Sequence, residues 1–240
     1  MKKVFLFASL FVFCQLFGQK KYSFDYTLVY KENCRKHKDT ISLIYMVNSK
    51  LNNFNLYALE EKSINYGLYF HDQEGVAVHA KVKKEDFYKA ETYTNSCEQT
   101  LRLSNPYKEK IKDYEFINFK DTLMNDTLYF HYAIKNLKSM KYQKRNEIVT
   151  SHFIVTKSNP DFIPILFHPT AYGKWKINKT IPNGILKTIY YIDYSGKIIG
   201  KMTLTAVVKI DKYLTIPNEC DYTKEEIRSK FVITNNGYFN

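Results

Sequence analysis

A regular alternation of apolar and polar residues is the feature that most constrains this chain. Large apolar side chains occupy every second position from Tyr22 to Tyr30, with mostly polar residues between them. Because successive side chains of a strand point to opposite faces of a sheet, this pattern places five apolar groups on one face. The same alternation returns at residues 41–47, 76–82 and 198–210. The chain is therefore predicted to be mainly β.

Shorter runs of the same kind raise the prediction to about ten strands. Turn residues between neighbouring runs, such as Ser195-Gly196, indicate hairpins and hence antiparallel pairing. A short helix is predicted near residues 84–93, and Thr223 can cap a C-terminal helix running to about Val232. We expect a curved antiparallel sheet or half-barrel with one C-terminal helix. The additional strands are predicted at 54–59, 66–70, 114–119, 127–134, 148–156 and 186–194.

Residues 158–184 break the strand pattern with four prolines, which predicts an irregular loop that covers the sheet. A sheet with a large apolar face must bury that face against another layer, and one short helix is too small to do so. We predict that the sheet curls around a space for a hydrophobic ligand gated by this loop. The alternative is that the loop itself fills the interior. Its large apolar side chains are Phe162, Ile165, Leu166, Phe167 and Trp175.

The N-terminus has the three-part pattern of a cleavable secretory signal over residues 1–19: two lysines, an apolar run and Gly18-Gln19. The apolar run at 4–17 is shorter than the ~20 residues that a permanent membrane helix needs. Phe13 before Cys14 disfavours lipoprotein processing. We expect one β-rich domain over 20–240, no transmembrane segment after cleavage, and a location in the periplasm or at the outer membrane or cell surface.

The charge balance is strongly basic, with 36 Lys and Arg against 24 Asp and Glu and a formal net charge of +12. A field of this sign attracts anionic lipid, polysaccharide or nucleic acid. The lysines, however, are scattered and often alternate with apolar residues, as on solvated strand faces. Predicted export makes nucleic acid the least suitable of the three, and we expect no nucleic-acid partner.

Three cysteines follow the predicted signal: Cys34, Cys97 and Cys220. An odd number in an oxidising compartment predicts one disulfide and one free or intermolecular thiol. We expect the pair Cys34–Cys97, because both residues fall in polar loops that flank the first half of the sheet. Cys34 and His37 also have a ligand-like spacing, but a closed zinc site needs four ligands and no second close pair follows. No metal site is predicted.

Catalytic and cofactor motifs do not stand out. The sequence has no Gly-rich phosphate loop, no Gly-x-Ser-x-Gly and no Cys-x-x-Cys, and its six histidines are dispersed. The turn at Glu74-Gly75 brings His71 and His79 onto adjacent strands, either as a shared metal or proton site or as an ordinary surface pair. We assign no catalytic residue and no cofactor.

One stretch carries a family resemblance. An early Tyr-x-Phe-x-Tyr strand and a Pro-rich loop precede Ile181-Pro182-Asn183-Gly184-Ile185-Leu186, which enters the final hairpin. The chain resembles the GLPGLI family of exported Bacteroidetes proteins, although Asn183 separates the Pro from the Gly and the leading Gly is absent. The resemblance implies a half-barrel like that of periplasmic lipoprotein carriers, able to shelter an acyl chain, and no catalytic residues.

The predicted function is a non-catalytic binding or carrier module for lipid or another apolar ligand in the cell envelope. The alternative is a structural or interaction component of an envelope assembly that uses its sheet edge and aromatic face to bind a protein partner. A hydrolase is the third hypothesis. A buried cavity favours the first, an exposed apolar patch the second, and a cleft with clustered His or acidic residues the third.

Overall fold

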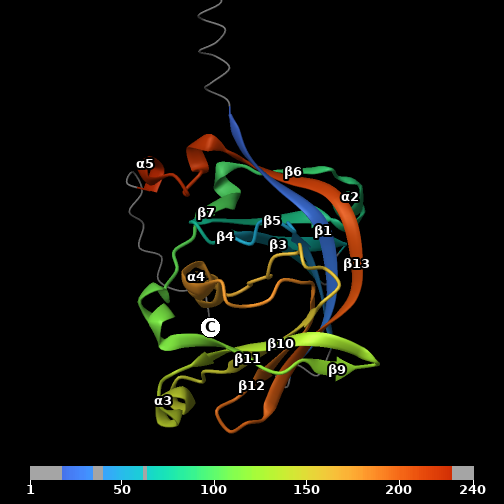
Figure 1. Cartoon of the computed structure of the whole chain (residues 1–240). Coiled ribbons are helices and arrows are strands. Elements are labelled where there is room, and N and C mark those ends of the chain that lie inside the picture. The colour runs from blue at the N-terminus through green and yellow to red at the C-terminus, as the bar shows by residue number, and fades with distance from the viewer. Residues whose placement is uncertain (1–17, 35–39, 62–63, 229–240) are drawn as a thin grey trace, which may run out of the picture.

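The computed structural model describes residues 18–34, 40–61 and 64–228. These residues form one open sheet of thirteen strands, and the predicted curved, mainly antiparallel sheet is confirmed. Its spine is a long ribbon in which β1 (Gln19–Cys34) pairs antiparallel with β13 (Ile198–Pro217) from end to end. Figure 1 shows the sheet curving like a C, with an arm extending from each side of this ribbon.

The first arm continues from β1 through antiparallel strands. They are β2 (Ile41–Val47), β3 (Phe54–Glu60), β4 (Asn65–Asp72), β5 (Val76–Lys83) and the short β7 (Thr100–Arg102). The second arm continues from β13. Its strands are β12 (Leu186–Ile192), β11 (Thr150–Thr156), β10 (Thr127–Asn136) and β8 (Tyr114–Asn118), with β9 (Thr122–Met124) paired to β10. β6 (Thr92–Thr94) pairs parallel with the end of β13.

Each of the ten predicted strands is present. The three that the sequence did not predict, β6, β7 and β9, have three residues each, which is too short for an alternating pattern to appear. The predicted helix near residues 84–93 is α2 (Lys84–Lys89), which ends earlier than expected. The C-terminal helix α5 (Glu225–Arg228) begins near Thr223 as predicted, and its expected continuation to Val232 lies outside the described residues.

The Pro-rich segment differs from its prediction as a wholly irregular loop, because it contains the helix α4 (Pro169–Asn178). Proline at the first helical position removes only an N–H that would have no partner within the helix, so Pro169 begins α4 rather than breaking it. Lys179 ends it in the left-handed conformation, with a φ of 46°. The remaining helical elements are α3 (Met140–Arg145), η1 (Cys97–Gln99), η2 (Lys108–Asp113) and η3 (Asn218–Cys220).

The apolar residues form two cores rather than the one long face that the alternation indicates. An inner core lies between the arms, and an outer core lies on the far side of the first arm, beneath α2 and β6. β1 changes cores along its length: Tyr22 and Phe24 join the outer core, and Leu28 and Tyr30 the inner one. The change coincides with a register shift between the two strands, where three residue steps on β13, from Lys212 to Lys209, lie opposite two on β1, from Phe24 to Tyr26.

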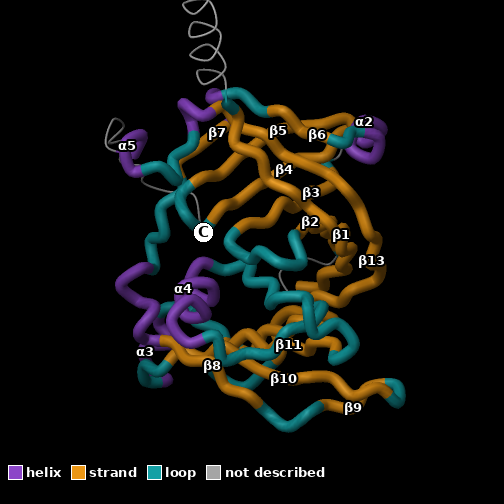
Figure 2. The backbone as a smooth tube through the Cα atoms, turned by 45° about the horizontal axis from the view of Figure 1, so that its top comes forward, coloured by secondary structure: helices purple, strands orange, loops and turns teal. Residues whose placement is uncertain are grey.

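The Pro-rich segment fills the inner core. Figure 2 shows α4 and the loop beside it between the two arms. Phe162, Ile165 and Leu166 are buried there, and Leu166 is only 2 % exposed. Of the two alternatives, the structure therefore has the loop filling the interior.

The disulfide joins Cys97 to Cys220, so the expected Cys34–Cys97 pair is wrong. β6 runs beside the end of β13, which brings η1, directly after β6, next to η3, directly after β13. The two Cα atoms are 5.5 Å apart, within the normal range for a disulfide. Cys34 instead ends β1 opposite Gly200, near the other end of β13.

Two predictions concern the membrane and the N-terminus. Among the described residues, no helix combines the length and the apolar character needed to span a bilayer. Residues 1–17, most of the predicted signal, lie outside the described part of the chain, and Gln19 begins β1.

Candidate functional site

A row of tyrosines crosses the inner face of the first arm. The strand register places Tyr45, Tyr57 and Tyr69 directly opposite one another on β2, β3 and β4. The rings of Tyr57 and Tyr69 are stacked, with centroids 5.0 Å apart and planes 14° apart, and Tyr45 lies 5.7 Å from Tyr57. Cross-strand aromatic pairs of this kind stabilise a sheet and present a continuous aromatic wall. We call these three residues the tyrosine row.

A cleft of about 240 Å³ opens between the tyrosine row and the segments at 103–107 and 167–169. Phe167 closes one side of it, because its ring stacks on Tyr45 at a centroid distance of 4.2 Å. Aromatic side chains and prolines make up much of the lining. The lining residues are Tyr45, Asn55, Tyr57, His71, Gln73, Leu103, Ser104, Pro106, Tyr107, Phe167, His168 and Pro169.

The five apolar residues predicted to cover a ligand do not all lie at this cleft. Phe167 lines it, while Phe162, Ile165 and Leu166 are buried in the inner core, against which Tyr45 also packs. Trp175, on α4, packs half-buried against the same core. Sequence reasoning found the covering segment but missed the opposite wall, because the alternation at residues 54–59 and 66–70 does not show that their tyrosines are in register.

The titratable groups of the cleft favour their neutral forms. Burial, and secondarily repulsion from His79, lowers the pKa of His71 to about 4. Burial also lowers the pKa of His168, whose Nδ1 accepts a hydrogen bond from the Thr170 N–H at 3.2 Å. The pKa of Tyr57 is raised by burial. At neutral pH the cleft therefore offers ring edges, hydroxyls and amides, and none of its lining residues is Asp, Glu, Lys or Arg.

His71 and His79 are neighbours but do not form the hypothesised directly opposed pair. Asp72 pairs with Val76 at the end of the hairpin, so His79 lies opposite Tyr69 and His71 opposite Ala77. The two imidazoles are diagonal on one face, with ring centroids 6.2 Å apart. Their relation is a tilted ring contact, with the two planes 55° apart.

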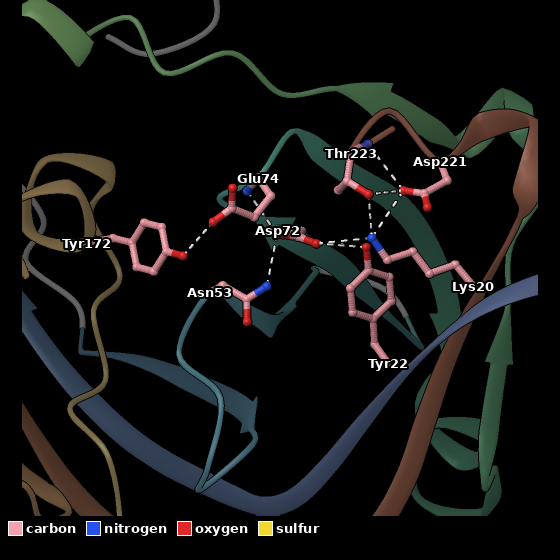
Figure 3. Close-up of polar contacts among 8 residues, drawn as sticks. All are labelled: Lys20, Tyr22, Asn53, Asp72, Glu74, Tyr172, Asp221 and Thr223. Atoms are coloured by element: carbon pink, nitrogen blue, oxygen red, sulfur yellow. Dashed lines mark hydrogen bonds and ion pairs between the residues drawn. The ribbon is translucent and has the colours of Figure 1, made fainter. Parts of the chain in front are cut away.

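A buried polar network lies beside the cleft (Figure 3), centred on Asp72 at the end of β4. The Asp72 side chain is 1 % exposed and accepts hydrogen bonds from the Tyr22 hydroxyl and the Glu74 N–H, both at 2.9 Å. Lys20 Nζ lies 3.6 Å from the same carboxylate. Burial raises the pKa of Asp72 despite these contacts. A buried carboxylate with this many partners fixes the turn that follows β4.

The network extends in two directions from that turn. Lys20 also binds Asp221 at 3.1 Å and the Thr223 hydroxyl at 2.6 Å, which joins the start of β1 to the segment after β13. On the other side, Glu74 accepts a 2.6 Å hydrogen bond from the Tyr172 hydroxyl and pairs with Lys176 at 3.0 Å. Because Tyr172 and Lys176 belong to α4, Glu74 holds the helix that begins at the cleft wall. From the sequence alone, the residues around Glu74 indicate only a turn.

Comparisons with known proteins give a fold likeness at low similarity. No protein-family model matches the chain, and no curated protein matches it, so the GLPGLI resemblance stays a prediction. An uncharacterized conserved protein from Thermus thermophilus has a TM-score of 0.42 at 4 % identity, with 78 % of each chain covered. A putative outer membrane lipoprotein-sorting protein domain from Vibrio parahaemolyticus has a TM-score of 0.32 at 9 % identity, with 77 % and 85 % covered.

The MucA/MucB complex of Pseudomonas aeruginosa is a further neighbour, with a TM-score of 0.37 at 5 % identity. The match covers 77 % of this chain and 51 % of that one, so this chain spans about half of its length. These likenesses concern the fold alone, and we infer no ligand or partner for this chain from them.

Proposed function

We propose that this protein is an exported, non-catalytic binding module that holds the apolar part of an amphipathic ligand in the cleft beside the tyrosine row. The cleft itself is the observation that supports the proposal: an aromatic, uncharged hollow on a rigid sheet, with hydroxyl and amide groups at its walls. Small-molecule sites have this composition, in which apolar walls supply affinity and a few polar groups fix orientation. Export follows from the predicted signal over residues 1–19.

The size of the cleft limits which ligands can bind there. Its volume of about 240 Å³ is below the roughly 300–1,000 Å³ of common ligand pockets. The inner core next to it is filled by Phe162 and Leu166, so a long acyl chain has no space between the arms. A medium-length acyl chain or a single ring system fits these limits. We propose medium-chain fatty acyl groups, whose carboxylate or ester end would remain near the polar groups at the mouth.

A blocking substitution tests the proposal. Ser104 lines the cleft and is exposed, so Ser104→Trp fills the hollow without disturbing a buried side chain. Titration of the purified chain with decanoate by calorimetry is expected to show saturable binding that Ser104→Trp weakens at least tenfold. Lys135→Trp, at an exposed position of β10 in the second arm, is the matched control and should bind like the unaltered chain. Equal binding by all three proteins, or none by any, contradicts the proposal.

A second candidate function, docking of an extended peptide, is favoured by one edge of β13. Its pairing with β12 ends at Thr203 and its pairing with β6 begins at Tyr213. Within the described residues no strand pairs with that edge between these two points, and Val207 and Val208 are 42 % and 49 % exposed. Open edges accept an added strand through main-chain hydrogen bonds. A partner bound there would slow amide hydrogen exchange at residues 205–212, whereas decanoate in the cleft would not.

A further inference from the structure

Three side chains converge on the second arm, on the face that points away from the inner core. His131 Nε2 lies 3.0 Å from His152 Nδ1 and 3.1 Å from the Tyr190 hydroxyl oxygen. They come from the adjacent strands β10, β11 and β12. Their chain neighbours Tyr132, Phe153 and Ile189 point the other way, into the inner core. The sequence shows only dispersed histidines, because the pairing of three strands is needed to bring them together.

The hydrogen-bonding capacity of this group does not match its geometry. A neutral imidazole nitrogen either carries one hydrogen or offers one lone pair. His131 Nε2, however, has two polar neighbours at hydrogen-bond distance. Whichever tautomer is present, that nitrogen satisfies one of them well and the other poorly. A cation bound between the three atoms would accept an electron pair from each of them and so remove this conflict.

Two of the separations among the three atoms fall in the range of ligands that share one metal ion. With metal–ligand bonds of about 2.0–2.1 Å, ligand atoms at right angles are about 2.9 Å apart, and those at tetrahedral angles about 3.3 Å apart. The separations of 3.0 and 3.1 Å lie between these two values. Imidazole nitrogens suit Cu²⁺, which binds such sites more tightly than Ni²⁺ or Zn²⁺ in the Irving–Williams order.

The surroundings hold the group in place and leave it reachable. The Phe119 ring lies nearly parallel to both imidazoles, at centroid distances of 4.5 Å from His131 and 5.5 Å from His152. His131 and His152 are both half-buried. His131 also lines an open depression of about 310 Å³. The cross-strand neighbour of Tyr190 on β13, Lys201, is exposed, so its ammonium group can extend into water.

We propose that His131, His152 and Tyr190 form a binding site for one divalent copper ion on the outer face of the second arm. The imidazole nitrogens coordinate as neutral ligands. The Tyr190 hydroxyl coordinates through its oxygen and releases its proton to solvent, so that a copper–phenolate bond replaces the O–H bond. The site is independent of the cleft on the first arm, and neither proposal depends on the other.

Titration with copper(II) chloride tests the site directly. The purified chain, with its free thiols alkylated so that they do not reduce the metal, is expected to bind one equivalent of Cu²⁺ by calorimetry. Its electron paramagnetic resonance spectrum should be axial, with coupling to two imidazole nitrogens. His131→Gln and His152→Gln should each weaken binding at least tenfold. His79→Gln, which alters an exposed histidine of the first arm, should leave the affinity unchanged.

Two further outcomes decide the assignment. Tyr190→Phe should abolish the visible phenolate-to-copper charge-transfer band while keeping both nitrogen couplings, and persistence of that band overturns the role of Tyr190. Thermal unfolding by circular dichroism identifies any variant that fails to fold, and the His131 and His152 variants serve as independent tests of each other. Unchanged copper affinity in folded His131→Gln and His152→Gln, or no bound copper in the unaltered chain, overturns the site.

Discussion

The two arms of the sheet are built alike, yet their inner faces are covered differently. On the second arm, inward-facing residues such as Tyr132 and Phe153 contact the Pro-rich segment and are buried. On the first arm, Tyr57 and Tyr69 are half-buried, and a cleft separates the tyrosine row from the 103–107 segment. The covering segment reaches the first arm at two places: after β2, where the Ile163 N–H donates to the Ser49 carbonyl oxygen and Asn52 to that of Pro164, and at the cleft, where Phe167 stacks on Tyr45.

This comparison teaches that an apolar sheet face does not by itself make a carrier. Whether a half-barrel is hollow depends on how much of its own chain enters the interior. Here the Pro-rich segment fills the inner core, and the cleft proposed for the ligand lies where that segment meets the first arm. The predictions below test how each arm is stabilised and covered, beginning with the largest expected effect.

Loss of the disulfide should have the largest effect on stability. Cys97 and Cys220 are 123 residues apart, and closing a loop of that length stabilises by up to about 5 kcal/mol in the chain-entropy model. The double variant Cys97→Ser and Cys220→Ser should lower the free energy of unfolding in urea by about 4 kcal/mol. Cys34→Ser is the control and should change it little. A larger loss of stability in Cys34→Ser than in the double variant would show that the disulfide involves Cys34.

Truncation in the covering segment should weaken the second arm. Ile181 is 6 % exposed in the inner core and lies beside Phe130 of the second arm, and Ile181→Ala should cost about 3 kcal/mol through lost burial and the cavity left behind. Leu137→Ala, at a 53 % exposed leucine, is the matched control and should cost under about 0.5 kcal/mol. Hydrogen exchange should show faster opening of β10 and β11 than of β3 and β4. Equal opening of both arms would remove the distinction between them.

The first arm should lose stability in mild acid. The pKa of His71 is lowered from 6.5 to about 4 in the folded chain, so the unfolded chain binds more protons between these values. The contribution of neutral His71 to the free energy of unfolding is therefore fully present above pH 6.5 and is lost as the pH falls toward 4. Because His71 is partly exposed, we expect the free energy of unfolding to fall by about 1–2 kcal/mol, which is less than the full pKa shift would give. Chemical unfolding from pH 7.5 to 4 should show this loss, and His71→Gln should reduce the slope. An unchanged slope in that variant would contradict the role of His71.

The smallest effect concerns the link between α4 and the first arm. Glu74→Gln weakens the hydrogen bond from Tyr172 and removes the ion pair with Lys176, at a cost of about 1 kcal/mol because the site is partly exposed. Glu85→Gln, which breaks an exposed pair with Lys89 on α2, should cost less than about 0.5 kcal/mol. Decanoate affinity should fall in Glu74→Gln alone. Equal affinity in both variants would show that Glu74 does not position the cleft wall.

The sequence predicts the strands well because alternation is a local property, and each run from Tyr22 to Ile210 carries its own evidence. It predicts the cores poorly, since the register shift beside Phe24, where β1 passes from one core to the other, has no local signature. Gly184 illustrates the same limit. The sequence shows it only as part of a motif. In the structure its φ is 141°, and a Cβ atom added there would lie 2.1 Å from the Thr156 carbonyl oxygen, so glycine is required.

The candidate sites were harder to predict than the fold, because each depends on several strands in register. The tyrosine row needs β2, β3 and β4, and the group around His131 needs β10, β11 and β12. The disulfide prediction was wrong for a related reason: the parallel contact between three-residue β6 and the end of β13 has no pattern of its own. Of the predicted covering residues, Phe167 lies at the cleft, since only its position in the segment faces Tyr45.

The central claim is that the ligand lies against the first arm and that the interior of the second is filled. Intermolecular nuclear Overhauser effects between decanoate and the isotope-labelled chain measure this directly. We predict contacts from the decanoate chain to the rings of Tyr57, Tyr107 and Phe167, and none to Leu28, Tyr132 or Leu166. Contacts to this second set would place the ligand between the arms, and would contradict the claim that the Pro-rich segment fills that space.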